Sequence, residues 1–232
     1  MEQLNHIAGL LALTMGAAWA SGINLYAAIL TLGLMGATGN IILPPGLEIL
    51  TDPMVLMAAG VMYFVEFFAD KIPGVDTAWD GLHTFIRIPA GAMLAAAAVG
   101  DINPAVELAA ALLGGGLAAS THAAKAGTRA LINTSPEPLS NWTASITEDV
   151  AVVVGLWTAL HHPVLYLALL GLFMLLLIWL LPRLWRGIRL VLQKIRSWFG
   201  GATQTLPPGV ASDALSQALS EESDDKAGRQ GG

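Results

Sequence analysis

The stretch from Glu66 to Pro89 reads E-F-F-A-D-K-I-P-G-V-D-T-A-W-D-G-L-H-T-F-I-R-I-P. It holds four acids, a histidine, a lysine and an arginine, and it lies between two apolar runs. Charged groups at bilayer depth are costly and are usually functional. The stretch therefore indicates a helical membrane protein and marks the place where its function is to be sought.

The composition favours the same class. Of the 232 residues, 55% are apolar and 12% are charged, which is about half the charged share of a soluble domain. The chain has no cysteine, which excludes disulfides, thiolate metal sites and a cysteine nucleophile. The formal charge is −6, and no basic patch with aromatic residues suits nucleic acid as a partner.

On both sides of this stretch, the chain contains apolar runs that are long enough to form membrane-spanning helices. About 20 apolar residues span the hydrocarbon core as a helix. We expect an all-α integral membrane domain over residues 1–181, with about six transmembrane helices and a short interfacial helix over residues 75–87. The six expected spans are residues 7–36, 53–70, 89–99, 105–131, 145–161 and 164–181.

The first apolar run is too long for one straight span. A helix of its length measures about 45 Å, against a hydrocarbon core of about 30 Å. Ser21-Gly22-Ile23-Asn24 is the candidate break, because glycine permits non-helical backbone and Ser and Asn can bond freed backbone groups. The alternative is an unbroken helix with a small-residue packing face at Gly16 and Ala20 and an interhelical hydrogen bond from Asn24.

The C-terminal part differs in composition. Residues 182–199 alternate apolar and basic positions at helical spacing, as expected of an amphipathic helix on an anionic membrane surface. Residues 200–232 are polar and acidic, and we expect them to be disordered.

The distribution of Lys and Arg predicts the topology. With six spans, all eleven Lys and Arg residues fall on the side that holds both termini or in the helix ends that reach that side. The positive-inside rule makes that side cytoplasmic in a cell (inner) membrane. Ala20-Ser21 resembles Ala119-Ser120, and Leu50-Thr51-Asp52 resembles Ile146-Thr147-Glu148. These echoes favour a three-plus-three inverted repeat, as in many transporters.

Acids and bases recur one helical turn apart within the predicted spans. Glu66 and Asp70 share a face of one helix, and Lys125 and Arg129 share a face of another. One interpretation is a structural ion-pair network that fixes helix packing. The other is a water-filled cavity that binds an ion or an anionic group. The candidate binding residues are Asn24, Glu66, Asp70, Arg87, His122, Lys125 and Arg129.

Asp76, Asp80 and His83 share one face of the expected interfacial helix. Carboxylate and imidazole ligands at this spacing are compatible with a divalent metal ion, and a solvated interfacial face is the alternative. Apart from such a cation, no cofactor is expected. Glu148 and Asp149 are expected in the first turn of the helix over residues 145–161, where acids suit the helix dipole.

Four segments together resemble the bacterial integral-membrane family called domain of unknown function 4126. They are A-S-G-I-N-L-Y, E-F-F-A-D-K-I-P-G-V-D, H-A-A-K-A-G-T-R and N-T-S-P-E-P, and the resemblance covers about residues 5–180. It implies a multi-pass fold and assigns no activity. Glu66 to Lys71 is also similar, more loosely, to the Glu-x-Gly-Asp-Lys motif of cation/proton exchangers. Here one extra residue separates the acids and Ala69 replaces the glycine.

The sequence favours a small secondary transporter or channel-like protein for a small ion or an anionic solute. One alternative is a membrane scaffold or binding protein with a structural ion-pair network. Another is a protein that handles phosphorylated lipid head groups through Arg87, Lys125 and Arg129. No nucleophile elbow, phosphate loop or zinc-protease motif is present, so an enzyme is less favoured. The expected partners are the bilayer, anionic head groups at the C-terminal helix and the ion or solute.

Overall fold

The computed structural model describes residues 2–72, 74–100, 102–133 and 138–199, and within these ranges the chain is helical without strands. The elements are α1 (Glu2–Ala37), the short 3-10 helix η1 (Pro45–Thr51), α2 (Pro53–Ala69), α3 (Val75–Val99), α4 (Pro104–Ile132), α5 (Pro138–His161) and α6 (Pro163–Phe199). The described chain divides after Arg189 into two units. The first unit holds the helical bundle.

Five described helices are long and apolar enough to cross a membrane, and the count rises to six if η1 and α2 form one bent span. The bend between η1 and α2 is 67°. The expected span over residues 53–70 corresponds to α2, and the expected span over residues 105–131 corresponds to α4. The tail over residues 200–232 lies outside the described residues.

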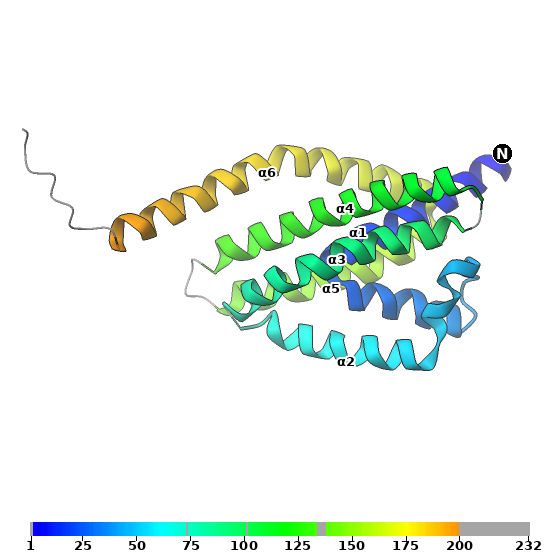
Figure 1. Ribbon diagram of the computed structural model, residues 1–232, viewed down its shortest axis with the longest axis horizontal. Coiled ribbons are helices and arrows are strands. Elements are labelled where there is room, and N and C mark those ends of the chain that lie inside the picture. The colour runs from blue at the N-terminus through cyan, green and yellow to red at the C-terminus, as the bar shows by residue number, and fades with distance from the viewer. Residues whose placement is uncertain (1, 73, 101, 134–137, 200–232) are drawn as a thin grey trace, which may run out of the picture. The chain divides into compact units, whose positions relative to one another are not determined.

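Helix α1 is the centre of the bundle, since α2, α3, α4 and α5 all pack against it (Figure 1). Small residues bring the backbones together, as in many membrane helix pairs. A Cβ added to Gly22 would lie 2.5 Å from the Ala118 carbonyl oxygen of α4. A Cβ on Gly91 of α3 would lie 2.5 Å from the Cβ of Ala118. The three helices therefore meet where only glycine fits.

The break expected in the first helix is present at Asn24. Its backbone leaves helical geometry, with φ −147° and ψ 100°. Its side-chain oxygen accepts a hydrogen bond of 3.0 Å from the backbone N–H of Ala27. That N–H would otherwise bond the carbonyl of Ile23, four residues earlier, so the break frees the Ile23 carbonyl inside the bundle.

The expected interfacial helix over residues 75–87 and span over residues 89–99 are one continuous helix, α3. Proline removes one backbone donor and often ends a helix, which is why a boundary was expected at Pro89. Here the hydroxyl of Ser21 in α1 donates to the backbone carbonyl of Arg87 at 2.9 Å. The close contacts of Gly91 then hold the helix after Pro89 against α1 and α4.

Two other expected boundaries are also corrected. Helix α5 begins at Pro138, seven residues before the expected start at Ser145, because proline suits the first helical position. Glu148 and Asp149 consequently lie in the helix interior, away from its first turn. Helix α6 continues through Pro182 to Phe199, so the basic segment is a continuation of the last apolar helix. Its place on a membrane surface stays a prediction.

Candidate functional site

Seven charged side chains from four helices meet inside the bundle, and we refer to them as the charge cluster. Helices α2 and α3 supply four members, and α4 and α5 supply three. All are buried except Glu148, whose side chain is 19% exposed. The members are Glu66, Asp70, Asp80, Arg87, Lys125, Arg129 and Glu148.

Arg87 joins α3 to α2. Its Nη2 lies 2.5 Å from Oε1 of Glu66, and its Nη1 lies 3.0 Å from Oδ1 of Asp80. Arg87 and Glu66 are completely buried. Both ion pairs lie in a medium of low effective dielectric, where removing one partner of a pair is far more costly than at a surface.

Lys125 lies at the centre of the cluster. Its Nζ is 3.0 Å from Oδ2 of Asp70, 3.4 Å from Oε1 of Glu66 and 3.5 Å from Oε2 of Glu148. It also donates a 3.1 Å hydrogen bond to the backbone carbonyl of Ile23, which is the group freed by the break at Asn24. The irregular backbone of α1 and the charge cluster are therefore parts of one site.

Arg129 fixes α4 against α5. Its Nε and Nη2 bond the two oxygens of Glu148, at 3.2 Å and 2.8 Å. This is the two-point geometry in which arginine binds a carboxylate most strongly. Its Nη1 donates to the backbone carbonyl of Asp70 and to both oxygens of Asn141.

The charges of the cluster do not balance. It holds four carboxylates, Glu66, Asp70, Asp80 and Glu148, against three cations. Three buried carboxylate oxygens, one each on Glu66, Asp70 and Asp80, have no hydrogen-bond partner among the described residues. The only cationic nitrogen of the cluster among the buried unpaired atoms is Nε of Arg87. The cluster therefore has spare acceptor atoms and excess negative charge, which suits a proton or a cation.

Asp149 forms a separate contact with α1 and α2. Asn24 donates to its Oδ1 at 2.9 Å, and the hydroxyl of Tyr63 donates to its Oδ2 at 3.1 Å. Sequence reasoning missed Glu148 and Asp149 as site residues because it placed the start of this helix at Ser145. It missed Tyr63 of α2 because only the contact with Asp149 brings this residue to the site. Pro138 at the first helical position was the signal that could have placed both acids in the helix interior.

Of the predicted binding residues, all seven lie in or beside this site. Asn24 contacts Asp149. The five charged residues of this set belong to the charge cluster: Glu66, Asp70, Arg87, Lys125 and Arg129. His122 extends the cluster through α4: its Nδ1 is 3.2 Å from Nη1 of Arg87, and its Nε2 is 2.8 Å from the hydroxyl of Thr84.

The three residues predicted as metal ligands, Asp76, Asp80 and His83, each bond a different group. The carboxylate of Asp76 accepts from the side-chain amide of Asn133 at 2.8 and 2.9 Å. Asp80 pairs with Arg87, and His83 contacts the hydroxyl of Tyr26 at 3.1 Å. Within the described residues, no group of three or more His, Asp or Glu side chains is arranged to hold a metal ion. The geometry gives the metal interpretation no support.

Lys71 lies in the turn between α2 and α3, beside the cluster. Its Nζ donates to the backbone carbonyl of Phe67 at 2.9 Å and contacts the hydroxyl of Ser145 at 3.4 Å. Burial lowers the pKa of this ammonium, against the opposing effect of the carboxylates of Asp149 and Asp70. Lys71 thus adds a partly desolvated charge at the edge of the site.

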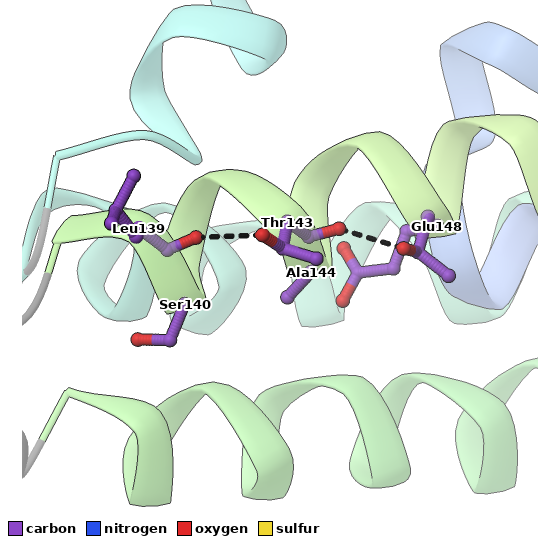
Figure 2. A pocket seen from close by; sticks show the side chains of 6 residues that line it. Leu139, Ser140, Thr143, Ala144 and Glu148 are labelled. Atoms are coloured by element: carbon purple, nitrogen blue, oxygen red, sulfur yellow. Dashed lines mark hydrogen bonds between the residues drawn. The ribbon is translucent and has the colours of Figure 1, made fainter.

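Two hollows beside α5 reach residues of the polar interior. One, of about 600 Å³, extends along α5 to Glu148, and Figure 2 shows the side chains that line it. Its lining residues are Leu139, Ser140, Thr143, Ala144, Thr147 and Glu148. The other, of about 390 Å³, lies among α1, α2 and α5 and includes Tyr63. Each hollow therefore includes a residue that bonds the polar interior, Glu148 itself in one and the Asp149 partner Tyr63 in the other.

Comparison with known proteins shows the family. The family model described as Domain of unknown function (DUF4126) matches residues 11–183, and the chain belongs to this family. No curated protein and no solved structure gives a significant match. The matched range includes every residue of the charge cluster.

Proposed function

We propose that the protein is a multi-pass protein of the cell (inner) membrane that moves a small cation or a proton. The apolar outer faces of the helices support the membrane location. Leu112, Leu175 and Ile178 are each about two-thirds exposed, whereas the charge cluster is inside. Such a distribution is costly in water and favourable in lipid.

The observation that carries the proposal is the unbalanced charge cluster beside a broken helix. Many transporters bind their ions near the bilayer midplane, where a discontinuous helix exposes backbone groups. Here Asn24 breaks α1, and Lys125 bonds the freed carbonyl. The unpaired carboxylate oxygens of Glu66, Asp70 and Asp80 supply acceptors for a positively charged ion.

The same contacts disfavour an anion or a phosphorylated head group as the substrate. Arg87, Lys125 and Arg129 all pair with carboxylates inside the protein. An anionic ligand would have to displace these buried pairs, at the cost of uncompensated charge.

The scaffold alternative assigns the cluster to packing alone. It accounts for the ion pairs, but a purely structural network has no need of an acid in excess. It also gives no reason for Glu148 to lie partly exposed beside a hollow of about 600 Å³.

The route that we propose connects the two hollows through the polar interior. It starts at Glu148, passes Lys125 and the break at Asn24, and ends at Asp149 and Tyr63. With both termini cytoplasmic, the hollow at Glu148 lies in the cytoplasmic half. The inverted repeat and the surface-bound basic segment fit this topology and stay predictions.

Flux in reconstituted vesicles tests this function. The purified chain should carry protons or a monovalent cation down an imposed gradient, followed with a pH-sensitive or cation-sensitive dye. Glu66→Gln and Glu148→Gln each remove a carboxylate that contacts Lys125 on this route and should lower the flux at least tenfold, as for a lost proton or ion carrier.

Glu107→Gln is the matched control. Glu107 is an exposed acid in the first turn of α4, outside the charge cluster, and its change should leave the flux intact. Equal flux in Glu66→Gln, Glu148→Gln and the wild type would remove the carboxylates from the route.

A further inference from the structure

A second candidate site has no residue of the charge cluster in its lining. A hollow of about 240 Å³ is enclosed by α1, α5 and α6, and its lining is almost entirely apolar. This volume suits part of a chain-like ligand more than a whole drug-sized molecule. The lining residues are Trp19, Ala151, Val154, Gly155, Thr158, Tyr166, Leu169, Leu170 and Phe173.

Two hydrogen-bonding groups of this lining have no partner. The indole Nε1 of Trp19 and the hydroxyl of Tyr166 are buried, and neither bonds another described group. Tyr166 is only 4% exposed. Buried Trp and Tyr side chains ordinarily bond a partner through these polar atoms. The pair therefore points to a ligand that brings hydrogen-bond acceptors into an apolar space.

Packing holds both aromatic rings in place. The ring of Trp19 lies edge-to-face to Tyr166 at 6.3 Å and to Phe173 at 6.2 Å between centroids. A Cβ on Gly155 would lie 2.5 Å from the Trp19 ring. The indole can therefore occupy this position because residue 155 has no side chain. The site is thus built from fixed side chains.

We propose that this hollow binds one phospholipid of the bilayer through its ester carbonyls. Trp19 and Tyr166 donate to the carbonyl oxygens, and an acyl chain lies along α6 toward Phe173. Tyr166 and Phe173 are seven positions apart, which corresponds to about 10 Å along the helix, a length that suits a chain segment. Tyr166 lies three residues after the start of α6 at Pro163, near the depth at which aromatic residues meet the lipid interface.

The site is independent of ion movement. It rests on the proposed membrane location, but it uses none of the residues of the charge cluster. The lipid is held between α6 and the centre of the bundle.

Lipid retention by the purified full-length chain tests the proposal. Native mass spectrometry counts the phospholipids kept after detergent washing and after return of a diester phospholipid, a diether phospholipid or a lipid-soluble quinone. The wild type should retain one diester lipid and prefer it about tenfold or more over the diether lipid, which lacks the carbonyls.

Trp19→Phe combined with Tyr166→Phe removes both donors and keeps both rings. This variant should bind the diester lipid about tenfold more weakly and lose its preference over the diether lipid. Trp185→Phe, at an exposed tryptophan of the same α6, is the control and should behave as the wild type. An unchanged melting temperature of the double variant shows that the fold is intact.

Retention of no lipid, equal retention of diester and diether lipids by the wild type, or preferential retention of the quinone would overturn the proposal. A chain that moves no ions but retains the diester lipid in this way would overturn the transport function and leave the lipid site in place.

Discussion

At the residue scale, one buried cation contacts several carboxylates. Lys125 contacts Glu66, Asp70 and Glu148, and Arg87 contacts Glu66 and Asp80. Such sharing lowers the cost of burying charge, but three cations cannot neutralise four acids. The imbalance makes different predictions for removing an acid and for removing a base.

Unfolding measurements on Glu66→Gln and Lys125→Met test the imbalance. Glu66→Gln breaks a buried pair with Arg87, but it removes the excess negative charge and leaves Arg87 paired with Asp80, so it should destabilise the protein less than Lys125→Met does. Lys125→Met deepens the imbalance in a buried site and should cost about 3–5 kcal/mol. Both are read from thermal or denaturant unfolding in detergent at neutral pH.

A balanced structural network gives another pattern. Each single change would then destabilise the protein by a similar amount, and the double change would restore much of the loss. That result would assign Glu66 and Lys125 to packing alone.

The residue types of the site could be read from the sequence, and some of their roles could not. Acids and bases at one-turn spacing identified Glu66, Asp70, Lys125 and Arg129. The pairing of Arg87 with both Glu66 and Asp80 depends on residues 75–87 packing inside the bundle as part of α3, whereas the sequence placed them at the membrane interface. Which carboxylate oxygens are unpaired depends on three-dimensional contacts, so it cannot be predicted from the spacing of residues along the sequence.

At the element scale, glycines set the distance between helices. Gly22 of α1 faces the Ala118 carbonyl and the side chain of Thr121 on α4. The close approach lets Lys125, one turn further along α4 from Thr121, reach the Ile23 carbonyl. Helix packing and the geometry of the site are therefore linked through Gly22.

Gly22→Ala tests this link. The added methyl group meets backbone that cannot move aside, so the change should cost about 1–3 kcal/mol of stability, as overpacking does. Gly116→Ala is the control, because a Cβ there meets nothing within 4 Å and alanine favours the helix. Differential scanning calorimetry compares the two, and equal melting temperatures would contradict the close-packing argument.

The helices themselves were predicted better than their boundaries. Apolar runs located α1, α2, α4 and the apolar part of α6. The boundaries expected near Ser145, Pro89 and Pro182 were wrong, because proline was taken to end helices. Tertiary packing carries α3 through Pro89, and proline at position 138 starts α5. The break at Asn24 was correctly located because glycine and two side chains able to bond the backbone occur together there.

At the scale of the whole molecule, the charge cluster is buried and large apolar side chains cover the outer faces of the described helices. The proposed topology follows from this distribution and from the positions of Lys and Arg. The chain has no native cysteine, so single introduced cysteines report their side of the membrane without background.

Ile42→Cys and Gly201→Cys test the topology. Ile42 lies between α1 and η1 and is 99% exposed, and Gly201 follows α6. An impermeant thiol reagent applied to sealed cells should label Ile42→Cys and leave Gly201→Cys unlabelled until the membrane is opened. Labelling of both from the same side would exclude the six-span arrangement and the inverted repeat with it.

The most direct measurement is the current that a pH or cation gradient drives through membranes containing the purified chain. The wild type should give a current that depends on the imposed gradient, because the excess carboxylate takes up and releases the ion. Glu66→Gln should abolish this current while the protein stays folded. Absence of a current in the wild type under every gradient of protons and monovalent cations would contradict the transport function, and a full current in Glu66→Gln would contradict the role of the charge cluster.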